Sequence, residues 1–176
     1  MATSDSKTTS ACGYVLGDDG LAKWSDSHAD AWIGLLETHK RLTRALDAEL
    51  EAEYGLSLSA AEALGRLAAA DGRALKLSLL AESCGLSLSR ISRIIDTLEA
   101  RTLVERRPVE SDARVVEAHL TDAGLDLVRR AQASHFASVQ ERFFSQLSHA
   151  DIDTLASVFS RFAPKAADEC DASPGA

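Results

Sequence analysis

Serine and arginine side chains recur along residues 85–107, on a segment that also carries an apolar stripe. Apolar residues at helical spacing predict a helix with one buried face, and they are Leu88, Ile91, Ile95 and Leu98. Hydroxyl and guanidinium groups, which contact phosphates and guanine edges in DNA, occupy a different stripe. The members of that polar stripe are Ser87, Ser89, Arg90, Ser92, Arg93 and Thr97. The segment could therefore offer a polar face to DNA, and the alternative is an ordinary solvated helix face.

The distribution of charge along the chain favours an anionic partner for this one segment. The 176 residues carry a formal net charge of −8. Residues 73–114 hold eight basic and six acidic side chains, a net charge of +2. Acidic side chains outnumber basic ones elsewhere, by three to two in 1–24, nine to four in 25–72 and nine to five in 115–176. The acidity of the whole chain therefore does not exclude nucleic acid at the central block.

A second group of side chains suits a small-molecule ligand. Its members are Trp32, Leu36, His39, Arg41 and Arg44. Tryptophan and histidine can stack on an aromatic ligand, and an arginine can hold a carboxylate. The alternative is structural: Trp32 and Leu36 would be ordinary core residues, with His39 a polar group at the edge of that core.

Other kinds of site find little support in the sequence. It has no G-x-S-x-G motif, no phosphate-binding glycine loop and no ordered Cys, His and Asp set, so we expect no enzyme. Because it also lacks an H-x3-H pair and a C-x2-C motif, neither a metal nor another cofactor is expected. Cys12, Cys84 and Cys170 are too scattered for a disulfide framework, and Cys84 is typical of a small buried hydrophobe. A redox- or metal-responsive protein, with a sensing role for Cys12 or Cys84, stays an alternative.

Helical periodicity and caps predict the elements that position these residues. A long helix covers 25–54 and ends at Gly55, and the capping-box pattern "SAAE" at Ser59 starts a shorter one. The segment "LKLSLLAESCG" forms a third helix. After a glycine turn, Ser87 or Ser89 caps the helix that carries the polar stripe.

The pattern changes after this helix. Two Val- and Leu-rich segments within 103–120 predict a β-hairpin. Thr121 and Ser148 then cap two more helices, and Pro164 stops the last one. The predicted fold class is mainly α with a small β-hairpin.

The helix pair and the hairpin together favour DNA binding. Two short helices joined by a glycine turn form a helix-turn-helix, whose second helix can lie in the major groove. The hairpin would be a wing, with Asp112 and Arg114 at a tip that could reach a neighbouring minor groove, where Asp112 would orient Arg114 by charge pairing.

Composition predicts a single folded unit between two tails. Residues 1–24 and 165–176 are polar and are expected to be flexible, and 25–164 are expected to fold together. No stretch of about 18 apolar residues and no signal sequence occurs, so we expect a cytoplasmic protein without a membrane partner. An apolar set near the C-terminus lacks cover within one chain and predicts a homodimer. It comprises Leu147, Ile152, Leu155, Phe159 and Phe162.

The segment from Leu80 to Gly124 resembles the winged helix-turn-helix core of the MarR family of bacterial transcriptional regulators. The resemblance rests on "LSLSRISRIIDTLEARTLVER", on the "DAR" that ends at Arg114, and on "LTDAG". It extends over roughly residues 25–163. The family often has glycine where this chain has Thr102, and often a second basic residue where it has Ala113.

The resemblance implies a homodimer that binds a palindromic operator in double-stranded DNA. Residues 25–54 and 121–164 would hold the dimerisation helices, and about 56–120 the winged helix-turn-helix. Such proteins are often repressors that release DNA when a small aromatic or anionic effector binds. A helical protein-interaction module without DNA binding is the alternative of a different class.

Overall fold

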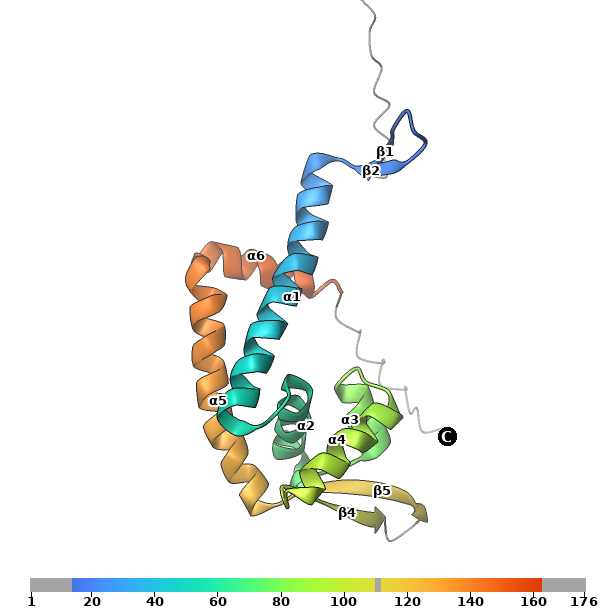
Figure 1. Cartoon of the computed structure of the whole chain (residues 1–176), viewed down its shortest axis with the longest axis vertical. Coiled ribbons are helices and arrows are strands. Elements are labelled where there is room, and N and C mark those ends of the chain that lie inside the picture. The colour runs from blue at the N-terminus through green and yellow to red at the C-terminus, as the bar shows by residue number, and fades with distance from the viewer. Residues whose placement is uncertain (1–13, 110–111, 163–176) are drawn as a thin grey trace, which may run out of the picture. The chain divides into compact units, whose positions relative to one another are not determined.

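The computed structural model describes residues 14–109 and 112–162, without the side chains of 112–114. The chain divides into two compact units, residues 1–135 and 136–176, which are described separately. Helices predominate, and a small antiparallel sheet lies in the first unit (Figure 1). The predicted fold class, mainly α with a β-hairpin wing, is confirmed.

The described part of the first unit begins with a short hairpin, in a region that was predicted to be a flexible tail. β1 (Tyr14–Leu16) pairs antiparallel with β2 (Ala22–Trp24). The rings of Tyr14 and Trp24 meet edge to face across the strands, with centroids 6.2 Å apart. Three-residue strands leave little periodic signal, which is why the prediction for 1–24 did not include them.

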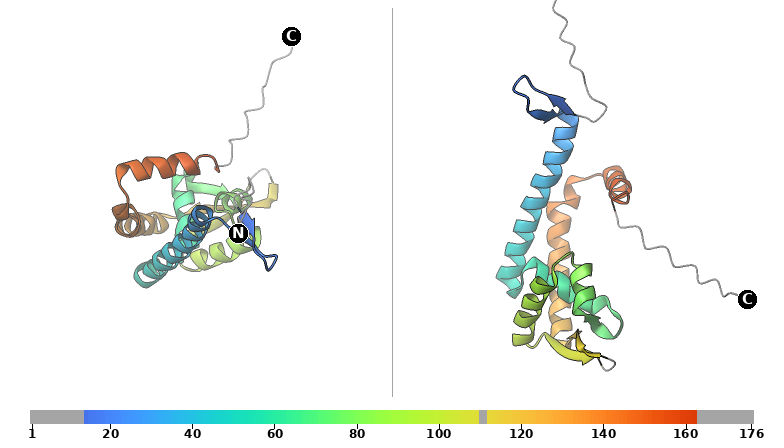
Figure 2. Two further views of the ribbon diagram at one scale, coloured as in Figure 1. Left: turned by 90° about the horizontal axis from the view of Figure 1, so that it is seen from above. Right: turned by 90° about the vertical axis from the view of Figure 1, so that its right-hand side faces the viewer.

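The long helix α1 (Asp26–Tyr54) follows, and it is continuous in the views of Figures 1 and 2. It ends at the predicted Gly55, whose φ of 62° lies in the left-handed region that glycine adopts without steric cost. α2 (Leu58–Ala69) has Ser57 as its N-cap, because the backbone is still extended there and the hydroxyl accepts an N–H of the first turn. The predicted capping box at Ser59 is therefore wrong.

The helix-turn-helix consists of α3 (Leu77–Ser83) and α4 (Leu88–Ala100). Gly85 in the turn has φ 62°, and Ser87 is the N-cap of α4. α3 begins later than the pattern predicted, because Ala74–Lys76 pairs with β5 as the strand β3.

The wing is the predicted hairpin, made of β4 (Val104–Val109) and β5 (Asp112–Leu120). With β3 it forms a three-stranded sheet in the order β3-β5-β4. Val104 and Ala118 are buried, and Arg106 pairs with Ala118, so Arg106 shares the inner face of the sheet.

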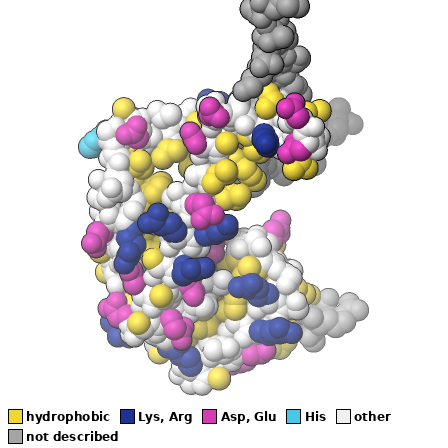
Figure 3. All heavy atoms as spheres, turned by 45° about the horizontal axis from the view of Figure 1, so that its top comes forward, with side chains coloured by type: hydrophobic (Ala, Val, Ile, Leu, Met, Phe, Trp, Pro, Cys, Tyr) yellow, Lys and Arg dark blue, Asp and Glu magenta, His cyan; other side chains and the backbone are white. Residues whose placement is uncertain are grey.

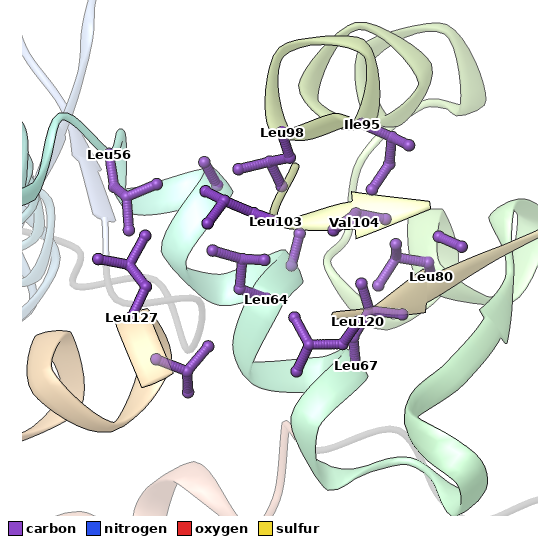
Figure 4. Packing of buried hydrophobic residues seen from close by; sticks show 14 of the residues in the cluster. Leu56, Leu64, Leu67, Leu80, Ile95, Leu98, Leu103, Val104, Leu120 and Leu127 are labelled. Atoms are coloured by element: carbon purple, nitrogen blue, oxygen red, sulfur yellow. The ribbon is translucent and has the colours of Figure 1, made fainter. Parts of the chain in front are cut away.

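The core lies between α2, α3, α4, the sheet and the first turns of α5 (Figure 4). Its largest fully buried side chains are Leu56, Leu64, Leu67, Leu80, Ile91, Ile95, Leu98 and Val104. Three members of the predicted apolar stripe of α4 are thus confirmed. Leu88 is not buried but 54% exposed, because it stands at the first position of α4, beyond the edge of the core.

The end of α4 keeps a backbone conformation typical of glycine. Thr102, at the position where the family often has glycine, has φ 59°, and its N–H donates to Glu99 O at 2.8 Å. A left-handed conformation costs a non-glycine residue roughly 1–2 kcal/mol. The chain therefore turns from α4 into β4 through a left-handed residue although no glycine stands there.

The second unit contains no buried residue among those the structure describes. Its elements are the end of α5 (Asp122–Arg142), a 3-10 turn (Phe144–Gln146) and α6 (His149–Phe159). The predicted cap at Ser148 is confirmed as a capping box with Asp151. α6 ends at Phe159, and the predicted stop at Pro164 lies outside the described residues.

Candidate functional site

The polar stripe of α4 is exposed on the side away from the core. Its exposed members are Ser87, Ser89, Arg90, Arg93 and Thr97. Within the described part of the chain, neither Arg90 nor Arg93 pairs with a carboxylate. Both guanidinium groups therefore have donors available for an external acceptor.

The hydroxyl groups of the stripe are partly engaged within the helix. Ser87 Oγ accepts the N–H of Arg90 at 3.3 Å and lies 3.1 Å from Ser89 Oγ. Thr97 Oγ1 donates to Arg93 O at 3.1 Å. Ser92 is only partly exposed. The two arginines are thus the members of the stripe best able to reach a partner.

Arg106, which the sequence analysis did not single out, joins α4 to the wing. Its side chain is 22% exposed and forms ion pairs of 2.6 Å with Asp96 Oδ1 and with Glu99 Oε2. It also donates to Ser92 O at 2.9 Å. Hydrogen bonds from the backbone N–H and the guanidinium of Arg106 hold the pKa of Glu99 below its ordinary value. The strand alternation that buries Val104 was the available signal, because it places Arg106 on the same face.

The two predicted wing residues lie at the start of β5. Asp112 pairs with Val109 of β4, and Arg114 follows on the same strand. Their side chains fall outside the described residues, so their groove contact stays a prediction. Arg107, on β4, is exposed and forms an ion pair of 2.8 Å with Glu105.

A groove of about 430 Å³ lies between α1 and the start of α2. We call it the α1–α2 groove, and its lining consists of His39, Lys40, Thr43, Arg44, Asp47, Leu58 and Ser59. The structure therefore brings together only His39 and Arg44 of the predicted ligand residues. Trp32, Leu36 and Arg41 lie outside the lining.

Charge in the α1–α2 groove favours an anion. Arg44 and Lys40, which also pairs with Glu37 at 3.0 Å, lie beside the N-terminal turn of α2, where the helix dipole attracts negative charge. Asp47 already accepts the N–H of Leu58 at 2.7 Å. The residues that sequence reasoning missed here come from two helices, and α2 places Leu58 and Ser59 opposite α1 only in the folded chain.

The first half of α1 carries an exposed apolar surface. No residue of 26–41 is buried, and Trp32 and Leu36 are 51% and 37% exposed. Hydrophobic side chains likewise reach the surface in the space-filling view (Figure 3). The alternative that Trp32 and Leu36 are core residues is therefore wrong within a single chain.

The surroundings of Cys84, the cysteine that the structure describes, favour its protonated thiol. Burial raises the pKa of the Cys84 thiol, and the nearby carboxylate of Glu62 raises it further. A raised pKa disfavours the reactive thiolate. Cys12 lies outside the described residues.

The described residues hold no group of three His, Cys, Asp or Glu side chains that could bind a metal ion. No helix among them has the length and apolar character to cross a membrane.

Together, the helix pair α3–α4, the exposed polar stripe and the wing define a winged helix-turn-helix protein. The model of the MarR family matches residues 54–115. The chain is also similar to AbsC, a MarR family transcriptional regulator from Streptomyces coelicolor, at 33% identity over 80% of this chain and 95% of AbsC, with a TM-score of 0.75. The chain therefore belongs to the MarR family of transcriptional regulators.

Two other solved structures extend this similarity. Sco3205 from S. coelicolor, a MarR family transcriptional regulator solved in complex with DNA, is 27% identical over 80% of this chain and 89% of its own, with a TM-score of 0.75. MarR from E. coli shares the fold at 21% identity, over 74% of this chain and 93% of its own, with a TM-score of 0.61. Among curated protein sequences no match was found.

Proposed function

We propose that this regulator binds double-stranded DNA through α4 and its wing. The observation that carries the proposal is the polar stripe of α4, exposed opposite three buried apolar residues of the same helix. The similarity to Sco3205, solved with DNA, supports it.

The contacts divide between the two grooves of DNA. Arg90 and Arg93 would touch bases or phosphates in the major groove, helped by the hydroxyl groups of the polar stripe. Arg114 would reach a neighbouring minor groove, with Asp112 orienting it by charge pairing. Arg106 would act indirectly, because it holds α4 against β4.

The test is the substitution Arg93→Ala. Duplexes selected from a random pool by the wild-type protein serve as probes in a gel-shift titration. A lost base contact should weaken binding by about 1–3 kcal/mol, or roughly 5- to 150-fold. Arg66→Ala is the matched control, because Arg66 lies on α2 and pairs only with Glu62, at 3.2 Å, among the described residues. Equal affinities of the two variants would contradict the role of Arg93.

We propose a homodimer as the binding form, with a palindromic operator as its target. The exposed apolar surface of α1 supports this, since a helix with such a face is expected to bury it against a partner. The second unit has no buried residue among those described, so its apolar side chains would also be covered by a partner. A two-fold axis would place the two copies of α4 in successive major grooves, about 34–36 Å apart.

We further propose that the protein is a repressor which releases DNA when a small anion, often aromatic in such regulators, occupies the α1–α2 groove. The cations that line the groove support this ligand class. A bound ligand would change the separation of the two copies of α4, and with it the affinity for the operator.

Two arginines one turn apart on α1, Arg41 and Arg44, provide the test of the ligand site. Benzoate and phenylacetate are added to the wild-type protein, to Arg44→Ala and to Arg41→Ala, and melting temperature and DNA release are followed. A ligand at 100-fold its Kd should stabilise the folded state by about 2.7 kcal/mol. We expect Arg44→Ala to lose this effect and Arg41→Ala to keep it, because only Arg44 lines the groove. No effect of either acid on the wild type would contradict the proposed ligand class.

A further inference from the structure

The charged side chains at the C-terminus of α1 interact unfavourably with the helix dipole. The last turn contains Glu51 and Glu53 and no basic residue. Carbonyl groups at the end of a helix carry partial negative charge, so nearby cations stabilise them and carboxylates do not. The N–H groups of Gly55 and Leu56 satisfy the carbonyls of Glu51 and Leu50. The carbonyls of Tyr54 and Gly55 need partners from elsewhere.

Arg101 supplies these partners from the end of α4. Its Nη1 donates to Gly55 O at 2.6 Å, and its Nη2 donates to Tyr54 O at 2.9 Å. A Cβ added to Gly55 would stand 3.7 Å from Nη1, so the guanidinium lies directly over the glycine. Because the guanidinium is a planar fork, two such bonds fix its orientation as well as its position. Arg101 follows Ala100, the last residue of α4, so the ends of α4 and α1 are joined.

The same point of α1 is also joined to α5. The hydroxyl proton of Tyr54 lies within reach of Glu53 Oε1, at 2.8 Å, and of Arg130 O on α5, at 3.1 Å. Ser134 Oγ donates to Glu53 Oε2 at 2.7 Å. The helix that bears the polar stripe, α4, and two of the proposed dimerisation helices, α1 and α5, are therefore joined at residues 53–55.

We propose that Arg101 is a positioning residue that determines which half-site spacing the dimer accepts. The inference rests on the proposed function, in which α1 lies at the dimer interface and α4 reads DNA. In such a dimer the distance from each α4 to the two-fold axis depends on how α4 is held to α1. One added base pair moves a half-site by about 3.4 Å and turns it by roughly 35°, as follows from a helical turn of about 34–36 Å for about 10 base pairs.

The experiment measures spacing selectivity rather than affinity alone. Duplexes selected by the wild-type protein from a random pool are remade with one base pair added or removed between the half-sites. Wild type, Arg101→Gln, Arg101→Lys and the control Arg66→Gln are titrated against the three lengths at several salt concentrations. Arg101→Lys keeps the charge but loses the fork, so it separates positioning from simple charge. If Arg101→Gln does not fold, the affinities of Arg101→Lys for the three duplex lengths test the proposal in its place.

We expect the wild type and Arg66→Gln to prefer the selected spacing. In both Arg101 variants the preference should fall by roughly 2- to 30-fold, the range that changes at coupling residues produce. A uniform loss of affinity at all three lengths, with a shallower salt slope and recovery in Arg101→Lys, would instead make Arg101 a phosphate contact and overturn the inference. A wild type that binds without any spacing preference would also overturn it. Failure of the wild type to select any duplex would contradict the proposed function itself.

Discussion

At Gly124 the backbone of α5 approaches Leu103, the residue before β4, so closely that no side chain fits. A Cβ built there would meet the carbonyl of Leu103 and come within 2.7 Å of Leu120 Cδ1. Thr121 caps the same turn, since its Oγ1 accepts the N–H of Gly124 at 3.0 Å and lies 3.1 Å from Leu103 O. This glycine therefore fixes the junction between the wing and α5.

We expect Gly124→Ala to lower the free energy of unfolding by about 1–3 kcal/mol, the usual cost of overpacking a tight site. Urea denaturation followed by circular dichroism measures it. Gly65→Ala on α2 is the control, because a Cβ added there would meet no neighbouring element within 4 Å. That change should stabilise the helix by roughly 0.5–1 kcal/mol. A Gly124→Ala protein as stable as the wild type would contradict the close approach.

The ion pairs of Arg106 with Asp96 and Glu99 hold the helix α4 against the strand β4. Glu99 accepts both the backbone N–H of Arg106, at 2.9 Å, and its guanidinium, at 2.6 Å. These bonds lower the pKa of Glu99 from an ordinary value of 4.5. A carboxyl whose pKa is lower in the folded state stabilises that state above its unfolded pKa, and the contribution is lost as pH falls through the folded pKa.

Glu99→Gln tests this contribution through its pH dependence. We expect the variant to be less stable than the wild type at pH 7, and the difference to shrink as pH falls below about 4.5. Urea denaturation at pH 7, 5, 4 and 3 follows the difference. Glu105→Gln is a suitable comparison, since the ion pair of Glu105 with Arg107 is exposed and should contribute little. A difference between wild type and Glu99→Gln that does not change with pH would contradict the role of the carboxylate.

The effect of truncating the apolar surface of α1 should differ between a monomeric and a dimeric molecule. In a monomer, truncation of Trp32 and Leu36 should be nearly neutral, because both are exposed. In a dimer that buries them, the double variant Trp32→Ala, Leu36→Ala should weaken association by more than about 1 kcal/mol, as truncation of interface anchors does.

Sedimentation equilibrium measures the dimer constant of both proteins. Leu79→Ala is the matched control, because Leu79 is 49% exposed but lies on α3. We expect this control to dimerise like the wild type. A wild-type protein that sediments as a monomer at micromolar concentration would refute the homodimer, and an unchanged constant in the double variant would remove α1 from its interface.

Much of the fold could be predicted because its signals are local. Helical periodicity identified the buried face of α4, and the stops and caps at Gly55, Ser87 and Ser148 involve residues within one turn of each other. The same locality explains the failures. β3 is only three residues long and is defined by its pairing with β5, and Leu88 follows the helical spacing although the core does not extend to it.

The sequence by itself therefore determined the order of the helices and the wing hairpin, the buried and polar faces of α4 and the family. Each depends on the spacing of residue types along the chain. Only the tertiary structure decided which distant groups meet: Arg106 with the carboxylates of α4, Arg101 with the end of α1, and Lys40 with Ser59 around one groove. These groups are distant along the chain or belong to different elements. Packing of the helices and the sheet around a shared core brings them together, so the spacing of residue types along the chain does not predict their contacts.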